Sequence, residues 1–192
     1  MVALRRSRGR RPAPDPRRSG RLSRTDSPTW PPAPDAAYPR IIAANGPKMA
    51  ALAGDIADGA LPAMLPAEFT AQARQALGPD RLLVVGLSVV SDPDADRAKA
   101  TARQMVSERL SAPSYAALIA TLGYLAQDIG DASDRLVDEL VAYGDPAAIA
   151  AKVCEHLAAG ADHVTLLLPI GGEFTAGVDQ LEQLAAALKF AK

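Results

Sequence analysis

The chain has 192 residues, of which 48% are hydrophobic and 22% charged, and its formal net charge is −1. This composition is typical of a soluble globular protein, and the near-zero charge gives the whole chain no electrostatic preference for nucleic acid. A single cysteine, Cys154, excludes an intramolecular disulfide framework and most thiolate metal sites. The longest apolar runs, 82–90 and 164–170, are under half the length of a membrane-spanning helix, so we expect a cytoplasmic protein without a membrane partner.

Charge is distributed unevenly along the chain. Residues 1–37 hold nine arginines, no lysine and three aspartates, a formal charge of +6, whereas the remaining 155 residues carry twelve basic and nineteen acidic groups, a charge of −7. Without apolar periodicity, the first segment cannot offset its ordering entropy by burial. We therefore predict a disordered Arg/Pro-rich segment over residues 1–29 and a folded domain over residues 30–192.

Three interpretations of residues 1–26 stay open. The segment is a basic arm for nucleic acid or anionic lipid, a targeting peptide, or spurious upstream sequence from a wrong start site or a shifted reading frame. The segment lacks lysines and interleaved aromatic residues, which are often present in an arm that follows a nucleic-acid groove.

From residue 40 onward, short apolar runs alternate with helical periodicity. We expect strands near residues 40–44, 59–63, 82–90 and 163–168. We expect helices after Pro47, Pro66, Pro93 and Pro146, because proline is favoured in the first turn of a helix, and a last helix from Val178 to Leu188. Residues 114–122 and 133–143 predict two further helices with no strand between them.

This alternation of strands and helices predicts an α/β fold with right-handed crossovers and a parallel sheet. Four strand–helix units suit either a small doubly wound sheet or half of an eight-stranded barrel. The turn Asn45-Gly46-Pro47-Lys48 follows the first of these strands and opens a helix. Such a turn directs backbone N–H groups and the positive end of the helix dipole at one point, which suits a phosphate.

Within that turn, Gly46 permits close approach to the backbone, Lys48 adds a positive charge and Asn45 can donate from its amide. The alternative is a plain strand–helix turn in which Asn45 caps the helix and Lys48 is solvated. The sequence motifs leave both interpretations open.

Four segments together resemble the luciferase-like monooxygenase superfamily, and in particular its branch that uses the deazaflavin coenzyme F420 in place of FMN. They are YPRIIAANGPKM at 38–49, LAGDIADGA at 52–60, YGDPAAIA at 143–150 and AGADHV at 159–164. The resemblance extends from about Trp30 to the C-terminus. It implies a partial TIM (β/α)8 barrel that contains strands five to eight of the family and lacks the first four.

The resemblance also implies a function, that of a flavin- or deazaflavin-dependent oxidoreductase or monooxygenase acting on a small molecule. Its cofactor would be coenzyme F420 or, alternatively, FMN. In the family, the loop after strand five helps to hold the cofactor phosphate, and we carry that role onto Asn45, Gly46 and Lys48, with Gly59 lining the same pocket. No catalytic residue can be carried over, because most polar groups near the reacting carbon belong to the missing half.

Other polar residues are expected to be structural. We assign His156 and His163 to the structure, Cys154 to packing, and Asp92, Asp94 and Asp96 to a helix cap rather than a calcium loop. We predict no metal site. Gly171 and Gly172 follow the last strand, where many barrels bind phosphate.

Half a barrel leaves two strand edges unpaired, those near Ile41 and Val164. Such edges favour association, so we expect a homodimer that completes a pseudo-barrel, or a chain that fails to stay soluble. Two rival interpretations of function stay open, a non-catalytic remnant or interaction protein, and a nucleic-acid accessory with a basic arm.

Overall fold

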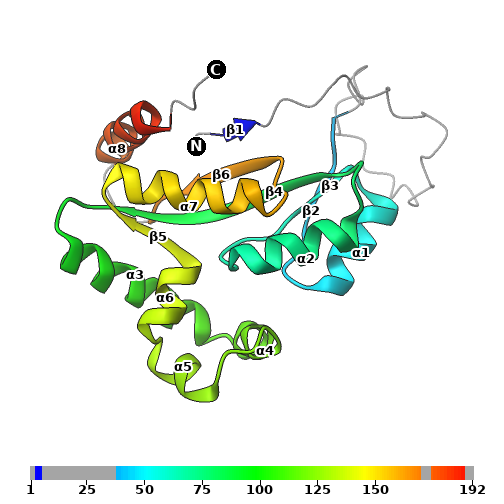
Figure 1. Ribbon diagram of the computed structural model, residues 1–192, viewed down its shortest axis with the longest axis horizontal. Helices are drawn as coiled ribbons and strands as arrows, with labels where there is room; N and C mark the ends of the chain where they lie inside the picture. The colour runs from blue at the N-terminus through cyan, green and yellow to red at the C-terminus, as the bar shows by residue number, and fades with distance from the viewer. Residues whose placement is uncertain (1–2, 6–37, 170–173, 189–192) are drawn as a thin grey trace, which may run out of the picture.

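The computed structural model describes residues 3–5, 38–169 and 174–188 (Figure 1). Gly171 and Gly172 lie outside the described residues. The strands are β1 Ala3–Arg5, β2 Ile41–Ala43, β3 Gly59–Leu61, β4 Leu82–Ser91, β5 Val141–Gly144 and β6 His163–Leu167. The helices are α1 Pro47–Ile56, α2 Ala67–Leu77, α3 Ala95–Leu110, α4 Pro113–Thr121, α5 Ala126–Asp131, α6 Asp134–Leu140, α7 Pro146–Ala158 and α8 Phe174–Ala187.

The described strands form one sheet in the order β1-β6-β4-β3-β2, with β5 also paired to β4. The long strand β4 is the centre of the sheet: its first residues pair with β3, its middle with β6 and its last with β5, all in parallel. β2 pairs in parallel with β3, so that Ala43 lies opposite Leu61. The predicted fold class, an α/β partial barrel with a parallel sheet, is confirmed.

The prediction of a helix over residues 133–143 is wrong for its last three residues, 141–143. The helix α6 ends at Leu140, and Val141–Gly144 form strand β5 against residues 88–91 of β4. A short apolar run after a helix satisfies either periodicity, and pairing with a distant strand decides between them. The short helix α5, which has no buried residue, was also not predicted.

The N-terminal segment also differs from its prediction. Ala3–Arg5, expected to be disordered, form β1, which pairs antiparallel with β6 and sets Leu4 opposite Val164. One of the two edges predicted to be open is therefore covered, while β2 stands at the other end of the sheet. Residues 6–29 lie outside the described residues.

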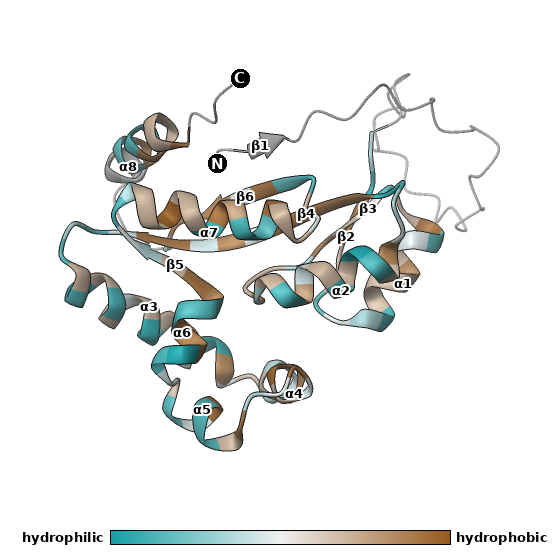
Figure 2. Ribbon diagram, in the orientation of Figure 1, coloured by the Kyte–Doolittle hydropathy of each residue, from teal (hydrophilic) through white to brown (hydrophobic). Residues whose placement is uncertain are grey.

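The core lies mainly between the sheet and the helices. On β4, Leu83, Val85, Leu87 and Val89 alternate with period two toward the helices and are at most 2% exposed. Figure 2 shows β4 and β6 hydrophobic along most of their length, while the helices alternate in hydropathy. The helices contribute many small side chains to this core, namely Ala50, Ala53, Ala98 and Ala102. Small side chains let helix and sheet backbones approach closely.

Arg74 closes the amino end of the sheet. Its Nε donates to the Gly160 carbonyl at 3.0 Å, and its Nη1 to the carbonyls of Gly78 and Arg81 at 2.8 Å. Its Nη2 donates to Asp162 Oδ2 at 2.6 Å, and that oxygen also accepts from the backbone N–H of Leu83 at 3.0 Å. One guanidinium thus joins the ends of α2 and α7 to the starts of β4 and β6.

His156 lies beside this network, fully buried in the last turns of α7. Its Nδ1 is 2.9 Å from the Thr70 hydroxyl of α2, and its Nε2 has no hydrogen-bond partner among the described residues. Burial, together with the smaller effect of the nearby Lys152, lowers the pKa of His156 to about 4. The ring is therefore neutral at pH 7. Cys154, expected to be packed, is exposed on the same helix.

Candidate functional site at the carboxyl ends of the strands

The turn between β2 and α1 leaves the start of a helix open. Gly46 occupies the N-cap position with φ −148° and ψ 157°, and no described side chain caps α1. Pro47 takes the first helical position, where its missing N–H costs nothing. The next backbone N–H groups, those of Lys48 and Met49, therefore point out of the helix end, where the dipole favours an anion.

Asn45 holds this turn to the neighbouring loop rather than capping the helix. Its Oδ1 accepts a hydrogen bond from the backbone N–H of Ala63 at 2.9 Å, just after β3. The interpretation of Asn45 as a helix cap is therefore wrong. With its oxygen occupied, the amide group keeps its two N–H donors for another partner.

Gly46 has no structural need to be glycine. Its backbone is extended, a conformation that any residue adopts. No atom of the described residues lies within 4 Å of the position that a Cβ would take, apart from its chain neighbours. A side chain here would project into the open space in front of the helix, which a bound group could use.

Lys48 and Gly59 are placed differently from each other. Lys48 is exposed, two positions before the buried Ala50 and so about 200° around α1 from it. Its side chain thus lies on the side of α1 away from the sheet. Gly59 lies four residues before Ala63 along β3, about 13 Å toward the amino end. The structure brings Asn45, Gly46 and Lys48 together in one turn and does not bring Gly59 to it.

The packing of Gly59 explains why a glycine stands there. A Cβ on Gly59 would lie 2.3 Å from the Leu82 carbonyl oxygen and 2.8 Å from Ile41 Cδ1. Three strands approach one another at this point, and only a residue without a side chain fits between them.

The loop after β3 carries a strained residue beside the turn. Met64 has φ 55°, a left-handed conformation that is uncommon for a residue other than glycine. Its N–H donates to the Gly86 carbonyl at 3.0 Å, and its carbonyl accepts from the Tyr115 hydroxyl. Tyr115 comes from α4 and is buried, and its ring centroid lies 4.7 Å from Cζ of the Arg109 guanidinium. Burial raises the pKa of the Tyr115 hydroxyl. Strain of this kind often accompanies functional sites.

Sequence reasoning did not find Met64 or Tyr115. Methionine gives no turn signal, and Tyr115 is 51 positions from its partner. A tyrosine on the buried face of a short helix was the available signal, because a buried hydroxyl needs a hydrogen-bond partner.

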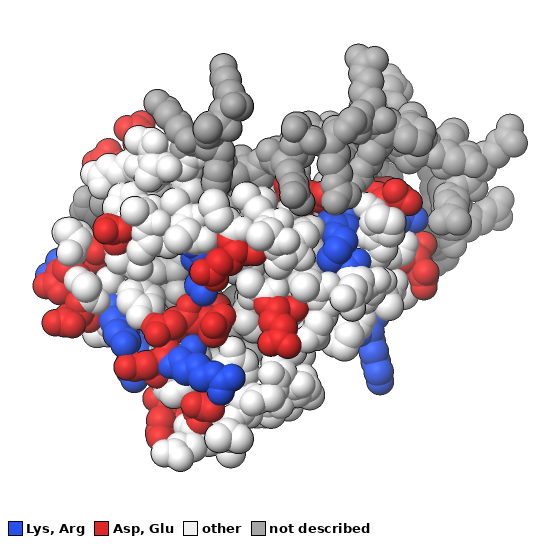
Figure 3. Space-filling view, viewed as in Figure 1, with Lys and Arg blue, Asp and Glu red and all other residues white. Residues whose placement is uncertain are grey.

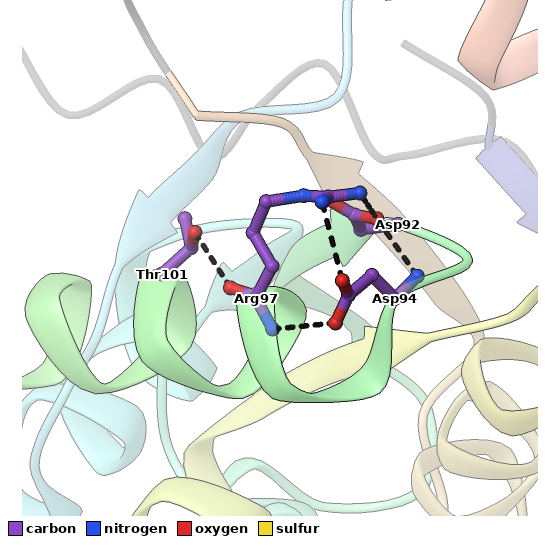
Figure 4. A network of polar contacts seen from close by, with 4 residues as sticks. All are labelled: Asp92, Asp94, Arg97 and Thr101. Atoms are coloured by element: carbon purple, nitrogen blue, oxygen red, sulfur yellow. Dashed lines mark hydrogen bonds and ion pairs between the residues drawn. The ribbon is translucent and has the colours of Figure 1, made fainter.

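In the loop after β4, the charged side chains of Asp92, Asp94 and Arg97 pair with one another (Figure 4). Asp94 Oδ1 accepts from the Arg97 N–H at 3.1 Å and caps α3, and Asp92 Oδ1 accepts from the Asp94 N–H at 2.9 Å. The Arg97 guanidinium contacts both Asp92 oxygens at 2.6 Å, and its hydrogen bond lowers the pKa of Asp92. The predicted cap is confirmed for Asp94; Pro93 precedes this N-cap instead of occupying the first helical position, and Asp96 lies in the first turn. Within the described residues, no group of three His, Cys, Asp or Glu could hold a metal ion.

An open hollow of about 270 Å³ lies elsewhere, along α6, β5 and α7. Its polar groups already have partners: the Tyr143 hydroxyl donates to Asp138, and Lys152 contacts Glu155 at 2.8 Å. Figure 3 shows acidic and basic side chains interleaved on this side of the molecule. None of the lining residues belongs to the turns after β2 or β3, so this hollow is separate from the candidate site.

The fold is that of half a βα barrel, and the open turn lies at the carboxyl end of a parallel strand, where barrel enzymes generally place their functional groups. The sequence model of the family described as "Luciferase-like monooxygenase" matches residues 11–163, and the chain belongs to that family. The match begins before the folded domain predicted from residue 30. No curated protein matches the chain.

Solved structures support the same fold. The coenzyme F420-dependent tetrahydromethanopterin reductase from Methanopyrus kandleri is 20% identical, with a TM-score of 0.52 over 79% of this chain and 51% of that one. An F420-dependent secondary alcohol dehydrogenase, in complex with an F420-acetone adduct, is 18% identical, with a TM-score of 0.55 over 82% and 51%.

A third structure, apo-MsnO8, is 14% identical, with a TM-score of 0.55 over 83% of this chain and 53% of that one. The chain thus spans about half the length of the solved structures it matches. No helix in the described part of the chain is long and apolar enough to cross a membrane.

Proposed function

We propose that the turn between β2 and α1 binds a phosphate group of coenzyme F420 or, alternatively, of FMN. On this proposal the chain takes part in a deazaflavin- or flavin-dependent oxidoreductase that acts on a small molecule. The family to which the chain belongs and its F420-dependent structural neighbours support the cofactor class.

The single observation that carries the proposal is Gly46. Nothing in its own conformation or packing requires a glycine, yet it stands in front of an uncapped helix end. A close approach of a ligand to the backbone would require the absence of a side chain at that position.

The other groups of the turn fit an anion. The backbone N–H groups of Lys48 and Met49 and the amide N–H groups of Asn45 would donate to phosphate oxygens. The Lys48 ammonium, on the outer side of α1, would add a screened charge rather than a direct contact. Gly59 is left out of this proposal because it lies at the other end of the sheet.

The inner face of the sheet offers an apolar wall beside the turn. Ala63 is bridged to Gly86, and a Cβ on Gly86 would lie 3.2 Å from Leu167 of β6, which places the three on one face. Leu167 is 38% exposed there. A flat ring could lie against these apolar residues. When bound, a reduced deazaflavin supplies a hydride, and the chain's own residues would bind and orient it.

A titration of the purified chain with coenzyme F420, followed by fluorescence, tests the proposal. We expect saturable binding that Gly46→Ala weakens at least ~10-fold and Lys48→Ala weakens less. The matched control is Gly130→Ala, because Gly130 in α5 also has nothing within 4 Å of a Cβ position. Absence of saturable binding to both F420 and FMN would favour the alternative, a non-catalytic half-barrel.

A further inference from the structure

The strained loop after β3 is held from two sides. The Met64 N–H donates to the Gly86 carbonyl of β4 at 3.0 Å, and the Met64 carbonyl accepts from the Tyr115 hydroxyl of α4. Met64 keeps its left-handed φ of 55° between these two hydrogen bonds. A residue other than glycine stays in such a conformation only where its surroundings hold it there. The Tyr115 hydroxyl is therefore one of two groups that fix the course of this loop.

Tyr115 reaches the loop from an insert between two strands. The helices α1, α2, α7 and α8 contact one another in this order, whereas α3 to α6 pack mainly against β4, β5 and one another (Figure 1). Within this insert, α4 buries Tyr115 and Ile119 in the same hydrophobic cluster as Met64 and Leu65 of the loop. The insert thus packs on the loop after β3, and this packing places the tyrosine hydroxyl.

The residue before Met64 connects the loop to the candidate site. Asn45 Oδ1 accepts from the Ala63 N–H at 2.9 Å. Because a backbone N–H can only donate, it selects the oxygen of the Asn45 amide and leaves the Nδ2 group on the side away from Ala63. The two Nδ2 donors therefore keep their direction only while the Ala63 N–H stays in place. Relaxation of the adjacent Met64 backbone would displace that N–H.

We propose that Tyr115 is a positioning residue for the phosphate site in the turn between β2 and α1. Its hydroxyl fixes the Met64 carbonyl, the loop then keeps the Ala63 N–H on Asn45, and the Nδ2 group donates to a phosphate oxygen. Tyr115 acts through the loop and does not itself touch the ligand. This inference rests on the proposed function and adds to it a residue from another part of the chain.

Ligands that differ in the phosphate separate this role from a general effect on stability. FMN carries the phosphate and riboflavin lacks it, and coenzyme F420 and its phosphate-free deazariboflavin core form the pair for the other ring. We expect Tyr115→Phe to weaken binding of the phosphate-bearing ligand roughly 3- to 10-fold and to leave the affinity for the phosphate-free ligand within about 2-fold. A merely structural residue would change both affinities equally, or neither.

The matched control is Tyr143→Phe, which removes another tyrosine hydroxyl, the one that donates to Asp138 in the separate hollow. Its ratio of the two affinities should equal that of the wild type. The double variant Asn45→Ala/Tyr115→Phe tests the path of the effect. Because Tyr115 acts through Asn45, Tyr115→Phe should weaken phosphate binding no further once residue 45 is alanine. Additive losses would overturn the proposed path.

Amide hydrogen exchange without ligand tests the positioning step by itself. In Tyr115→Phe, we expect the N–H groups of Ala63 and Met64 to exchange at least ~10-fold faster relative to that of Leu87. Leu87 lies in the middle of β4, opposite Leu166 of β6, so its exchange reports the overall opening of the sheet. Equal acceleration at all three positions would show that Tyr115 only stabilises the fold, and would overturn the proposal.

The two measurements distinguish failure of this inference from failure of the proposed function. A wild-type chain that binds the phosphate-bearing ligand no more tightly than the phosphate-free one has no phosphate site, and both proposals are then overturned, whatever the exchange rates. A wild-type chain that prefers the phosphate-bearing ligand, with the same preference in Tyr115→Phe, keeps the phosphate site and overturns the positioning role alone.

Discussion

The two ends of the parallel sheet are built differently. At the amino end, Arg74 has acceptors for its Nε, Nη1 and Nη2, and any side chain at Gly59 would clash with β2 and β4. At the carboxyl end, α1 begins without a side-chain cap among the described residues, and Gly46 faces open space. The amino end uses its polar groups for stability, whereas the carboxyl end leaves the start of α1 without a side-chain cap, and in barrel enzymes generally this end binds the ligand.

Two glycines show the same division. Gly46 and Gly59 both have extended backbone. The neighbours of Gly59 leave no room for a side chain, whereas no described neighbour of Gly46 requires a glycine. A polar or small residue at a strand end therefore has a different meaning according to which end of the strand it occupies.

The largest effect is expected from Arg74→Leu. It would remove donors to three carbonyls and leave the Asp162 carboxylate, 3% exposed, without its guanidinium partner. We expect the free energy of unfolding in urea to fall by about 3–5 kcal/mol. Arg97→Leu at the carboxyl end is the control and should change stability much less, because Arg97 is exposed. Equal losses would remove the contrast between the two ends.

The free energy of unfolding should depend on pH through His156, which is buried beside the Arg74 network at the amino end of the sheet. Burial holds the pKa of His156 at about 4 in the folded chain, whereas its ordinary value, which we take for the unfolded chain, is 6.5. As the pH falls, the unfolded chain binds the proton first. The contribution of the neutral His156 to the free energy of unfolding is therefore fully present above pH 6.5. It is lost as the pH falls toward 4, by on the order of 3 kcal/mol in total.

Urea unfolding of the wild type and of His156→Leu across this pH range isolates the effect of the histidine from that of the carboxylates. The variant should lack that part of the pH dependence. Parallel curves for the two proteins would show that His156 is not held neutral by burial.

The two glycines allow a direct comparison. Gly59→Ala would place a Cβ 2.3 Å from a carbonyl oxygen, and we expect a loss of about 1–3 kcal/mol in thermal or urea unfolding. Gly46→Ala should change stability by no more than about 0.5 kcal/mol while it weakens cofactor binding. A stable Gly59→Ala variant would mean that β2 and β4 separate easily at that end.

A loss of stability smaller than that of Arg74→Leu is expected from Tyr115→Phe. This change removes the donor to the Met64 carbonyl and should cost about 1–2 kcal/mol in urea unfolding. If the Tyr115 hydroxyl holds the strained loop beside the turn, F420 affinity should also fall. Unchanged stability would mean that water replaces the hydroxyl without cost.

The sequence by itself determined the alternation of strands and helices, because hydrophobic periodicity and proline at helix starts are local signals. Within the candidate site, it placed Asn45, Gly46 and Lys48 in one turn, because they are adjacent in the chain. The proposed cofactor role of that turn rests on the family resemblance and stays a prediction.

Only the tertiary structure decided what depends on distant neighbours. The pairing of Val141 with Ser88 made a strand of a segment with helical spacing, and the register of β2 against β3 set Gly59 opposite Ile41, away from the turn. The contact of Tyr115 with Met64 followed from the packing of α4 against the loop after β3. Each of these outcomes is a contact between residues far apart in the sequence, and local patterns carry no information about such contacts because they do not specify which surfaces meet.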